Sequence, residues 1–245
     1  MKTHRSPIVI ASALALSAFT SAVAAPPDSA QSYNPTIDPA NFSIEVNNPY
    51  FKLTPGTTYT YKSKQEEGIE INKVTVTDIT KKVMGVTTRV VWDRVWINDQ
   101  LIEETYDWYA QDKEGNVWYF GENSKAYRMG KKGSWEAGVD GAKPGIVMPV
   151  KPRPGKPYRQ EYLKCQAEGT AQVLSVDESI KVPFGLFKNC LKTKDWSAIE
   201  TGSIEHKYYS KEVGNVVLET EDGDKKRVEL IDVATTTENG QTKTK

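Results

Sequence analysis

The sequence is poor in the residues that most often bind metals or carry catalysis. It has two histidines, and His4 lies in a predicted signal peptide, so only His206 remains in the mature chain. A single histidine excludes paired-histidine zinc and copper sites and the HExxH pattern of zinc proteases. No GxSxG turn is present to hold the serine of a Ser-His-Asp triad. We therefore expect no metal and no cofactor.

Long apolar runs are also missing beyond the N-terminus. The first residues combine a basic start at Lys2 and Arg5, an apolar stretch and the Ala22-Val23-Ala24 pattern of a cleavage site. The apolar stretch is shorter than the roughly 20 residues that a membrane-spanning helix needs. We predict a signal peptide over residues 1–24, cleaved near Ala24. The mature protein would be periplasmic or secreted, with no transmembrane segment.

The chain has no excess charge of either sign, with 32 Lys and Arg against 32 Asp and Glu. Nucleic acids and anionic membrane surfaces are bound through clustered positive charge. The balance therefore argues against both as partners, and it leaves a protein partner open. Basic residues between Lys143 and Lys156 lie in a proline-rich stretch, which we interpret as a solvated loop.

Helical periodicity is absent, because no segment longer than about ten residues repeats with a period of 3.6. Runs such as TTYTYKSKQ and KVMGVTTRVVWDRVWIN are rich in Val, Ile, Thr, Tyr and Trp and are separated by short polar turns. Short turns join antiparallel neighbours. We predict an all-β fold, an antiparallel meander of about eleven strands that forms a curled half-barrel or a barrel.

These strands fall within residues 42–233, which we interpret as a single domain. Residues 25–41 are rich in Pro, Ser and Asn and predict a flexible leader. The polar residues 234–245 predict a disordered tail. Residues 137–157 carry too many Pro and Gly for a regular strand and predict a long loop that divides the meander in two.

The chain has only two cysteines, Cys165 and Cys190. If the polar residues Val176 to Ser179 close a hairpin, these cysteines lie opposite each other, which predicts a cross-strand disulfide. An exported protein meets oxidising conditions that favour such a bond. The alternative is two free thiols, because a bulge near Pro183 would turn the sulfur atoms to opposite faces.

Aromatic residues gather in the run YDWYAQDKEGNVWYFGE. Its DKEGN segment fits a hairpin turn better than a calcium loop, since it lacks the ligand spacing of one. This turn places Trp108 opposite Phe120 and Tyr109 opposite Tyr119. Cross-strand aromatic pairs of this kind stabilise a hairpin by up to about 1 kcal/mol each. We expect Trp108 and Phe120 to face the core.

The other face of the hairpin mixes aromatic and polar side chains, as small-molecule sites do. Asp107, Tyr109 and Tyr119 are therefore candidate ligand-binding residues, together with His206. The alternative is that the face only packs in the core, and that His206 is a packed histidine. No catalytic residue can be assigned, because the carboxyl groups are scattered along the sequence.

Several runs resemble a family of secreted bacterial β-rich proteins of unassigned function. They are YDWYAQDKEGNVWYFGE, GSWEAGVDGAKPGIVMP, YRQEY, NPYFKLTPGTTYTY and KYYSKEVGNVVLE, so the resemblance covers roughly residues 48–220. The last run has Gly214-Asn215 where such proteins are expected to have GVG or GIG. The resemblance implies export and a β architecture, and it supplies no catalytic residue.

Three functions fit these observations. The first is an exported, non-enzymatic binding protein that holds an apolar or amphipathic small ligand, or a sugar-like one, in a β cup. The second is a hydrolase of a carbohydrate or envelope polymer that uses an Asp/Glu pair. The third is a protein-interaction module without a small-molecule site, which would use the 137–157 loop.

Overall fold

The computed structural model describes residues 33–127, 133–200, 202–221, 226–236 and 242–244. The predicted signal peptide over residues 1–24 lies outside the described residues. Within these ranges, no helix has the length and apolar character to cross a bilayer.

One short 3-10 helix, η1 (Pro39–Asn41), precedes a series of strands. The first strands are β1 (Phe42–Ser43), β2 (Asn47–Asn48), β3 (Phe51–Lys52), β4 (Thr57–Gln65), β5 (Gly68–Val83), β6 (Val86–Ile97), β7 (Gln100–Asp112), β8 (Val117–Ala126), β9 (Ser134–Glu136) and β10 (Lys143–Met148). The later strands are β11 (Tyr158–Arg159), β12 (Glu161–Tyr162), β13 (Gly169–Val182), β14 (Gly185–Ser197), β15 (Glu205–Ser210), β16 (Asn215–Glu221), β17 (Lys226–Thr236) and β18 (Thr242–Thr244).

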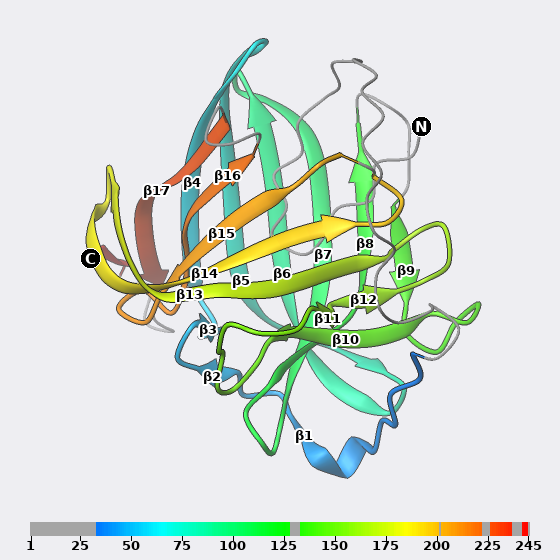
Figure 1. Ribbon diagram of the computed structural model, residues 1–245. Helices are drawn as coiled ribbons and strands as arrows, with labels where there is room; N and C mark the ends of the chain where they lie inside the picture. The colour runs from blue at the N-terminus through cyan, green and yellow to red at the C-terminus, as the bar shows by residue number, and fades with distance from the viewer. Residues whose placement is uncertain (1–32, 128–132, 201, 222–225, 237–241, 245) are drawn as a thin grey trace.

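Sixteen of these strands form one antiparallel sheet. Its main path follows the order β11-β13-β14-β15-β16-β17-β4-β5-β6-β7-β8-β10-β12, so most neighbours in space are neighbours in sequence. The sheet curls until it is nearly closed and barrel-shaped (Figure 1). The predicted all-β, antiparallel, barrel-like fold is therefore confirmed. The strands outnumber the prediction because pieces of two or three residues, such as β2 and β11, carry too little pattern to be recognised in a sequence.

A segment of five residues brings the two ends of the sheet together. Tyr158 and Arg159 pair with β13 at one end of the strand order, and Glu161 and Tyr162 form the strand that pairs with β10 at the other end. Gly145 makes this approach possible, because a Cβ at that position would lie 2.4 Å from the Gln160 carbonyl carbon. The closure removes most of the unpaired edge that an open sheet of this size would expose.

Alternation along the strands gives the barrel interior a polar half and an apolar half. Along β7 the buried positions on one face change from Thr105 and Asp107 to Tyr109. The neighbouring strand β6 changes in the same sense, from Asp93 to Val91. Two strands elsewhere in the sheet do so too, with Asp195 to Leu191 in β14 and Lys207 to Tyr209 in β15. The turns β6–β7 and β14–β15 lie at the polar end.

The apolar end of the interior is closed by the N-terminal segment that contains β2 and β3 (Figure 1). Phe51 packs against Tyr109 with ring centroids 5.2 Å apart. The backbone N–H of Lys52 donates to the carbonyl of Gly214 at 2.7 Å. The barrel therefore has an apolar floor, and its polar half lies toward the opposite end.

Three predicted segment assignments need correction. The loop predicted over 137–157 contains β10, since Pro144 can occupy a strand position where its missing N–H is not required. The tail predicted as disordered from residue 234 begins inside β17, and β18 pairs with that strand. Within the predicted flexible leader, the hydroxyl of Tyr33 donates to the carbonyl of Pro144 at 2.8 Å.

The predicted disulfide is wrong, because Cys165 and Cys190 are both free. The polar stretch expected to form the hairpin turn lies inside β13, and the turn falls between Val182 and Gly185. This shift of register places Cys190 opposite Glu178. Cys165 lies before β13 begins, in a turn where its φ is 59°.

Candidate functional site

Strands β7 and β8 bring two carboxyl groups together in the polar half of the interior. Asp107 lies directly opposite Glu122, and Tyr109 lies opposite Tyr119 as predicted. Between these pairs the register shifts at Phe120, so Trp108 faces Gly121 and the predicted Trp108–Phe120 pair is wrong.

Gly121 is the residue that makes this bulge possible. Its φ is +134°, and a Cβ there would lie 2.3 Å from the carbonyl oxygen of Trp135 in β9. Only glycine fits such a conformation and such a close approach. The bulge therefore lets β9 lie close against β8 and bring Trp135 next to Tyr119, with ring centroids 5.2 Å apart.

The hydroxyl of Tyr119 lies between the two carboxyl groups. Its oxygen is 2.8 Å from Asp107 Oδ1 and 3.0 Å from Glu122 Oε2. Burial, and then the charge of neighbouring carboxylates, raises the pKa of Asp107 and of Glu122 well above the ordinary range. A phenol carries one hydrogen, so both contacts are hydrogen bonds only when one carboxyl is protonated and donates to the phenol oxygen.

The structure brings three of the four predicted site residues together. Tyr109 stacks on Tyr119 with ring centroids 5.1 Å apart, and Asp107 completes the group. All three side chains are buried. His206 is not part of the group, because it follows Glu205 and precedes the buried Lys207, and alternation turns it to the other face of β15.

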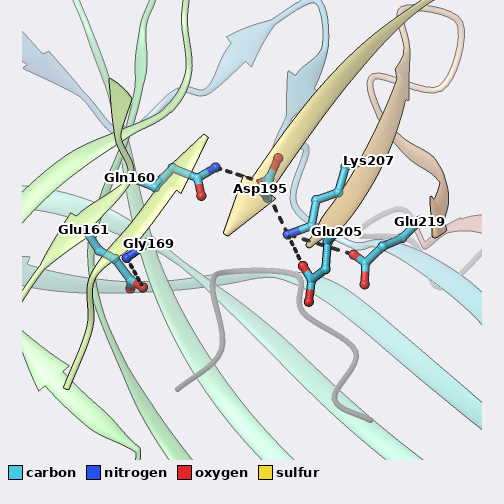
Figure 2. A network of polar contacts seen from close by, with 7 residues as sticks. All are labelled: Gln160, Glu161, Gly169, Asp195, Glu205, Lys207 and Glu219. Carbon is cyan, nitrogen blue, oxygen red and sulfur yellow. Dashed lines mark hydrogen bonds and ion pairs between the residues drawn. The ribbon is translucent and has the colours of Figure 1, made fainter. Parts of the chain in front are cut away.

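A second cluster lies on β14, β15 and β16 and was not foreseen. The ammonium of Lys207 is 3.6 Å from Asp195, 3.5 Å from Glu205 and 3.9 Å from Glu219 (Figure 2). Lys207 is 1% exposed. Burial alone would lower the pKa of this lysine, but the three carboxylates raise it above its ordinary value. Burial also raises the pKa of Glu205 and of Glu219.

The segment that closes the barrel joins the two clusters. Gln160 Nε2 donates to Asp195 Oδ2 at 3.3 Å, and the N–H of Gly169 donates to Glu161 Oε1 at 3.2 Å (Figure 2). Burial raises the pKa of Glu161 to about 8, although the Gly169 N–H and the charge of Lys207 act in the opposite direction. The charge of Glu161 in turn contributes to the raised pKa of Glu122.

The interior carries far more acid than base. Seven carboxyl side chains of the described residues are buried, against one buried lysine: Glu70, Asp93, Asp107, Glu122, Glu161, Asp195 and Glu219, with Lys207. Burial raises the pKa of four of these acids, Asp107, Glu122, Glu161 and Glu219. A group of buried acids with raised pKa values marks a candidate functional site.

Several buried polar atoms in the same region lack a hydrogen-bond partner among the described residues. They include Glu161 Oε2, Gln160 Oε1, Asp195 Oδ1 and the hydroxyls of Tyr109 and Tyr158. An unpaired buried polar group costs about 1–3 kcal/mol. A polar ligand that reached these atoms would remove this cost. The described residues contain no cluster of three or more His, Cys, Asp or Glu arranged to hold a metal ion.

A cleft of about 360 Å³ reaches this region from the side of β9. Its lining includes Lys81, Trp108, Glu122, Trp135 and Glu136. The ammonium of Lys81 lies 3.6 Å from the ring centroid of Trp108 and 2.7 Å from Glu136 Oε2. Glu122 lines the cleft and also belongs to the Asp107–Tyr119 group, so this one residue is shared by the cleft and the interior acids.

A second cleft, of about 530 Å³, lies near the floor of the barrel. Tyr59, Phe184, Phe187 and Val233 give it a mainly apolar lining. None of the predicted site residues contributes to it.

The residues missed by sequence reasoning share one signal. Glu205, Lys207 and Tyr209 alternate along one strand, opposite to the face that carries His206. Charged residues that alternate in register with a buried tyrosine indicate a polar barrel interior. The sequence alone does not show that Asp195 and Glu219 lie on the same wall.

Comparisons with known proteins do not assign the chain. No protein-family model matches it, and no curated protein matches it. The crystal structure of a candidate lipoprotein from Parabacteroides distasonis ATCC 8503 is similar over 75% of this chain and 97% of that chain, with 13% identity and a TM-score of 0.36. The resemblance to secreted bacterial β-rich proteins stays a prediction.

Proposed function

We propose that this protein binds a small amphipathic organic cation, an amine with an apolar body. The ligand would enter the cleft beside Trp108 and Trp135 and meet the carboxyl groups at Glu122. One observation carries the proposal: among the residues that the structure describes, seven buried carboxyl groups share the interior with a single buried lysine. This narrows the expected apolar, amphipathic or sugar-like ligand to an amphipathic one with positive charge.

The cleft already holds an ammonium group of the protein itself. Lys81 lies over the ring of Trp108, which supports the idea that this site favours a cation. An ammonium over a tryptophan ring gains about 0.5–2 kcal/mol, depending on how far it is desolvated. Trp135 offers a second ring to an apolar body, and Glu122 a carboxyl group to a charged head.

The distribution of the acids favours an organic cation over a metal ion. Asp107 and Glu122 lie on β7 and β8, whereas Asp195 and Glu219 lie on β14 and β16. Carboxyl groups spread along a wall suit an extended ligand, because a metal ion needs several oxygen atoms within about 2.6 Å of one point.

The first test is calorimetric titration with three ligands of equal chain length: octylamine, octanoate and octanol. We expect only octylamine to bind, because the apolar body is common to all three and only the amine is positive. Binding should also release protons, since an approaching ammonium lowers the raised pKa values of Glu122 and Glu161. The binding enthalpy should therefore depend on the buffer. Equal affinity for octanoate or octanol would contradict the proposal.

Glu122→Gln is the matched variant. It keeps the shape of the side chain and removes its charge, so we expect octylamine to bind at least about tenfold more weakly. Glu66→Gln removes one charge from an exposed turn and serves as control. Near-UV circular dichroism would confirm that both variants are folded. Unchanged affinity of the folded Glu122 variant for octylamine would show that the ligand does not bind in the cleft.

A hydrolase is the second candidate, favoured by the Asp107 and Glu122 pair. Their oxygen atoms lie 2.8 and 3.0 Å from one hydroxyl, so the two carboxyls approach the separation found in retaining glycosidases. The Tyr119 hydroxyl, however, occupies the space that a scissile bond would need. Binding is therefore better supported. If the protein hydrolysed an envelope polysaccharide and the Asp107→Asn variant did not, the hydrolase would become the better supported function.

The proposed binding site would act outside the cytoplasm. This rests on the predicted signal peptide and its cleavage near Ala24, in residues that the structure does not describe. N-terminal sequencing of the exported protein tests it directly.

A further inference from the structure

The outer surface of the sheet carries a row of aromatic and basic side chains that the proposed site does not use. Along β6, alternation points Trp92, Arg94 and Trp96 outward, opposite to the buried Asp93 and Val95. These outward side chains are partly exposed.

The cations on this surface rest on aromatic rings. The guanidinium carbon of Arg94 lies 3.6 Å from the ring centroid of Trp92 and 5.2 Å from that of Trp96. Lys73 Nζ lies 5.8 Å from the Trp96 centroid. Trp92 also stacks on Tyr106, with centroids 5.9 Å apart and an interplanar angle of 6°. Stacking holds the side chains in place before any partner arrives.

Glu104 is the acidic residue in the middle of this surface, and three aromatic donors engage it. Trp92 Nε1 donates to its Oε1 at 2.9 Å, the Tyr106 hydroxyl lies 3.4 Å from the same oxygen, and the Tyr127 hydroxyl donates to Oε2 at 3.0 Å. Lys125 lies over the Tyr127 ring at 4.4 Å.

The basic groups make no close ion pair among the described residues, although the charge of Glu104 acts on Arg94. Among the ion pairs found within 4.0 Å between described residues, none includes Lys73, Arg94 or Lys125. The register places these three residues in one row across the sheet, with Glu104 between Arg94 and Lys125. Neighbouring strands are about 4.8 Å apart, so the row consists of two adjacent cations, then the Glu104 carboxylate, then a third cation.

The distribution of charge over the whole molecule reinforces this surface. Setting aside the seven buried carboxyl groups, Lys207, and Lys2 and Arg5 of the predicted signal peptide leaves 29 Lys and Arg against 25 Asp and Glu. The neutral sequence thus conceals an acidic interior and a basic remainder. The near-zero net charge, taken alone, gave no sign of this separation.

We propose that this outer aromatic face, formed by Lys73, Trp92, Arg94, Trp96 and Lys125, binds an extended acidic polysaccharide whose carboxylates meet the row of cations. Charge complementarity and preorganisation carry the assignment. A single-stranded nucleic acid fits less well, because its bases need free ring faces on which to stack. Here Arg94 covers Trp92, and Lys73 lies over Trp96.

The test measures binding of immobilised alginate, a linear polymer of uronic acids, with neutral dextran and oligo(dT) as comparisons. We expect alginate to bind, dextran not to bind and oligo(dT) to bind more weakly than alginate. The triple variant Lys73→Ala/Arg94→Ala/Lys125→Ala should bind alginate at least about tenfold more weakly. Preferred binding of oligo(dT), or no binding of alginate, would overturn the proposal.

A matched control separates this face from general charge attraction. Lys164→Ala/Lys181→Ala/Lys188→Ala removes the same charge from exposed positions on other segments, and should change alginate affinity less than about twofold. An equal loss in both triple variants would overturn the proposal. Arg94→Lys keeps the charge and loses the planar contact with Trp92, so its affinity for alginate should fall as well. Wild-type affinity in that variant would show that stacking of Arg94 does not contribute to binding. Octylamine binding should be unchanged in all of these variants.

Discussion

Asp107 and Glu122 lie directly opposite each other on β7 and β8, and the hydroxyl of Tyr119 joins their carboxyl groups. Two buried carboxylates this close repel each other, and burial already raises the pKa of both. The pair therefore holds a proton to higher pH than either carboxyl would in water. This places a titratable, negatively biased pair where Glu122 meets the cleft.

Tyr119→Phe tests the bridging hydroxyl. We expect the free energy of unfolding to fall by about 1–3 kcal/mol, because both buried carboxyls lose a partner. The loss should be larger at about pH 8 than at about pH 5, since the hydroxyl stabilises the ionised form of Asp107. Urea unfolding at the two pH values measures this. Tyr127→Phe, which alters an exposed hydroxyl, is the control; equal losses at both pH values would contradict the prediction.

Stability should fall as the pH rises through the range in which Glu161 ionises. Its pKa is about 8 in the folded protein, against about 4.3 in an unfolded chain. A carboxyl with a raised pKa binds more protons when folded, so its stabilising contribution is complete at low pH and is lost toward pH 8. The slope is at most about 1.4 kcal/mol per pH unit for one group.

Comparing Glu161→Gln with the wild type by urea unfolding between about pH 5 and pH 8 isolates this effect. The variant cannot ionise, so its stability should decline less steeply, while Glu66→Gln should follow the wild type. Parallel profiles for Glu161→Gln and the wild type would show that Glu161 has an ordinary pKa.

Lys207→Met should be among the most destabilising changes in the interior. Removing one partner of a buried ion pair costs about 3–5 kcal/mol, because uncompensated charge remains. Here three carboxylates lose their common cation. The loss should shrink at lower pH, because burial raises the pKa of Glu205 and of Glu219 and so favours their neutral forms. Lys194→Met, on the opposite face of β14 from Asp195, is the control in the same unfolding assay. A loss below about 1 kcal/mol at neutral pH would contradict the prediction that Lys207 compensates buried negative charge.

The fold was predictable because its information is local. Alternation along β4 and β5, with short turns between strands, indicates an antiparallel meander without any knowledge of distant contacts. Barrel closure depends instead on residues 158–162, which pair with strands at both ends of the sheet. No repeat or turn motif marks that contact in the sequence.

Only part of the candidate site was predictable from the sequence. Tyr109 and Tyr119 face each other as the hairpin turn requires. The bulge that puts Glu122 opposite Asp107 accompanies the close approach of Trp135 in β9 to Gly121 in β8. Because β9 is not part of the β7–β8 hairpin, the hairpin sequence alone does not indicate this contact. Similarly, the sequence pattern predicts that Lys207 lies on the surface, because only barrel closure places its face of β15 inside.

The two cysteines should remain reduced even in protein purified without a reducing agent. Cys190 lies in β14 opposite Glu178, whereas Cys165 lies in a turn before β13, so the strand register keeps the two apart. Cys165 is exposed, and burial raises the pKa of the Cys190 thiol to about 11. We expect a thiol reagent such as DTNB to modify one cysteine rapidly in the native protein, and both after unfolding in urea. Cys165→Ser should abolish the rapid reaction and leave the slow one. No reactive thiol in the unfolded, unreduced wild type would mean that a 165–190 bond forms, which the described register does not allow.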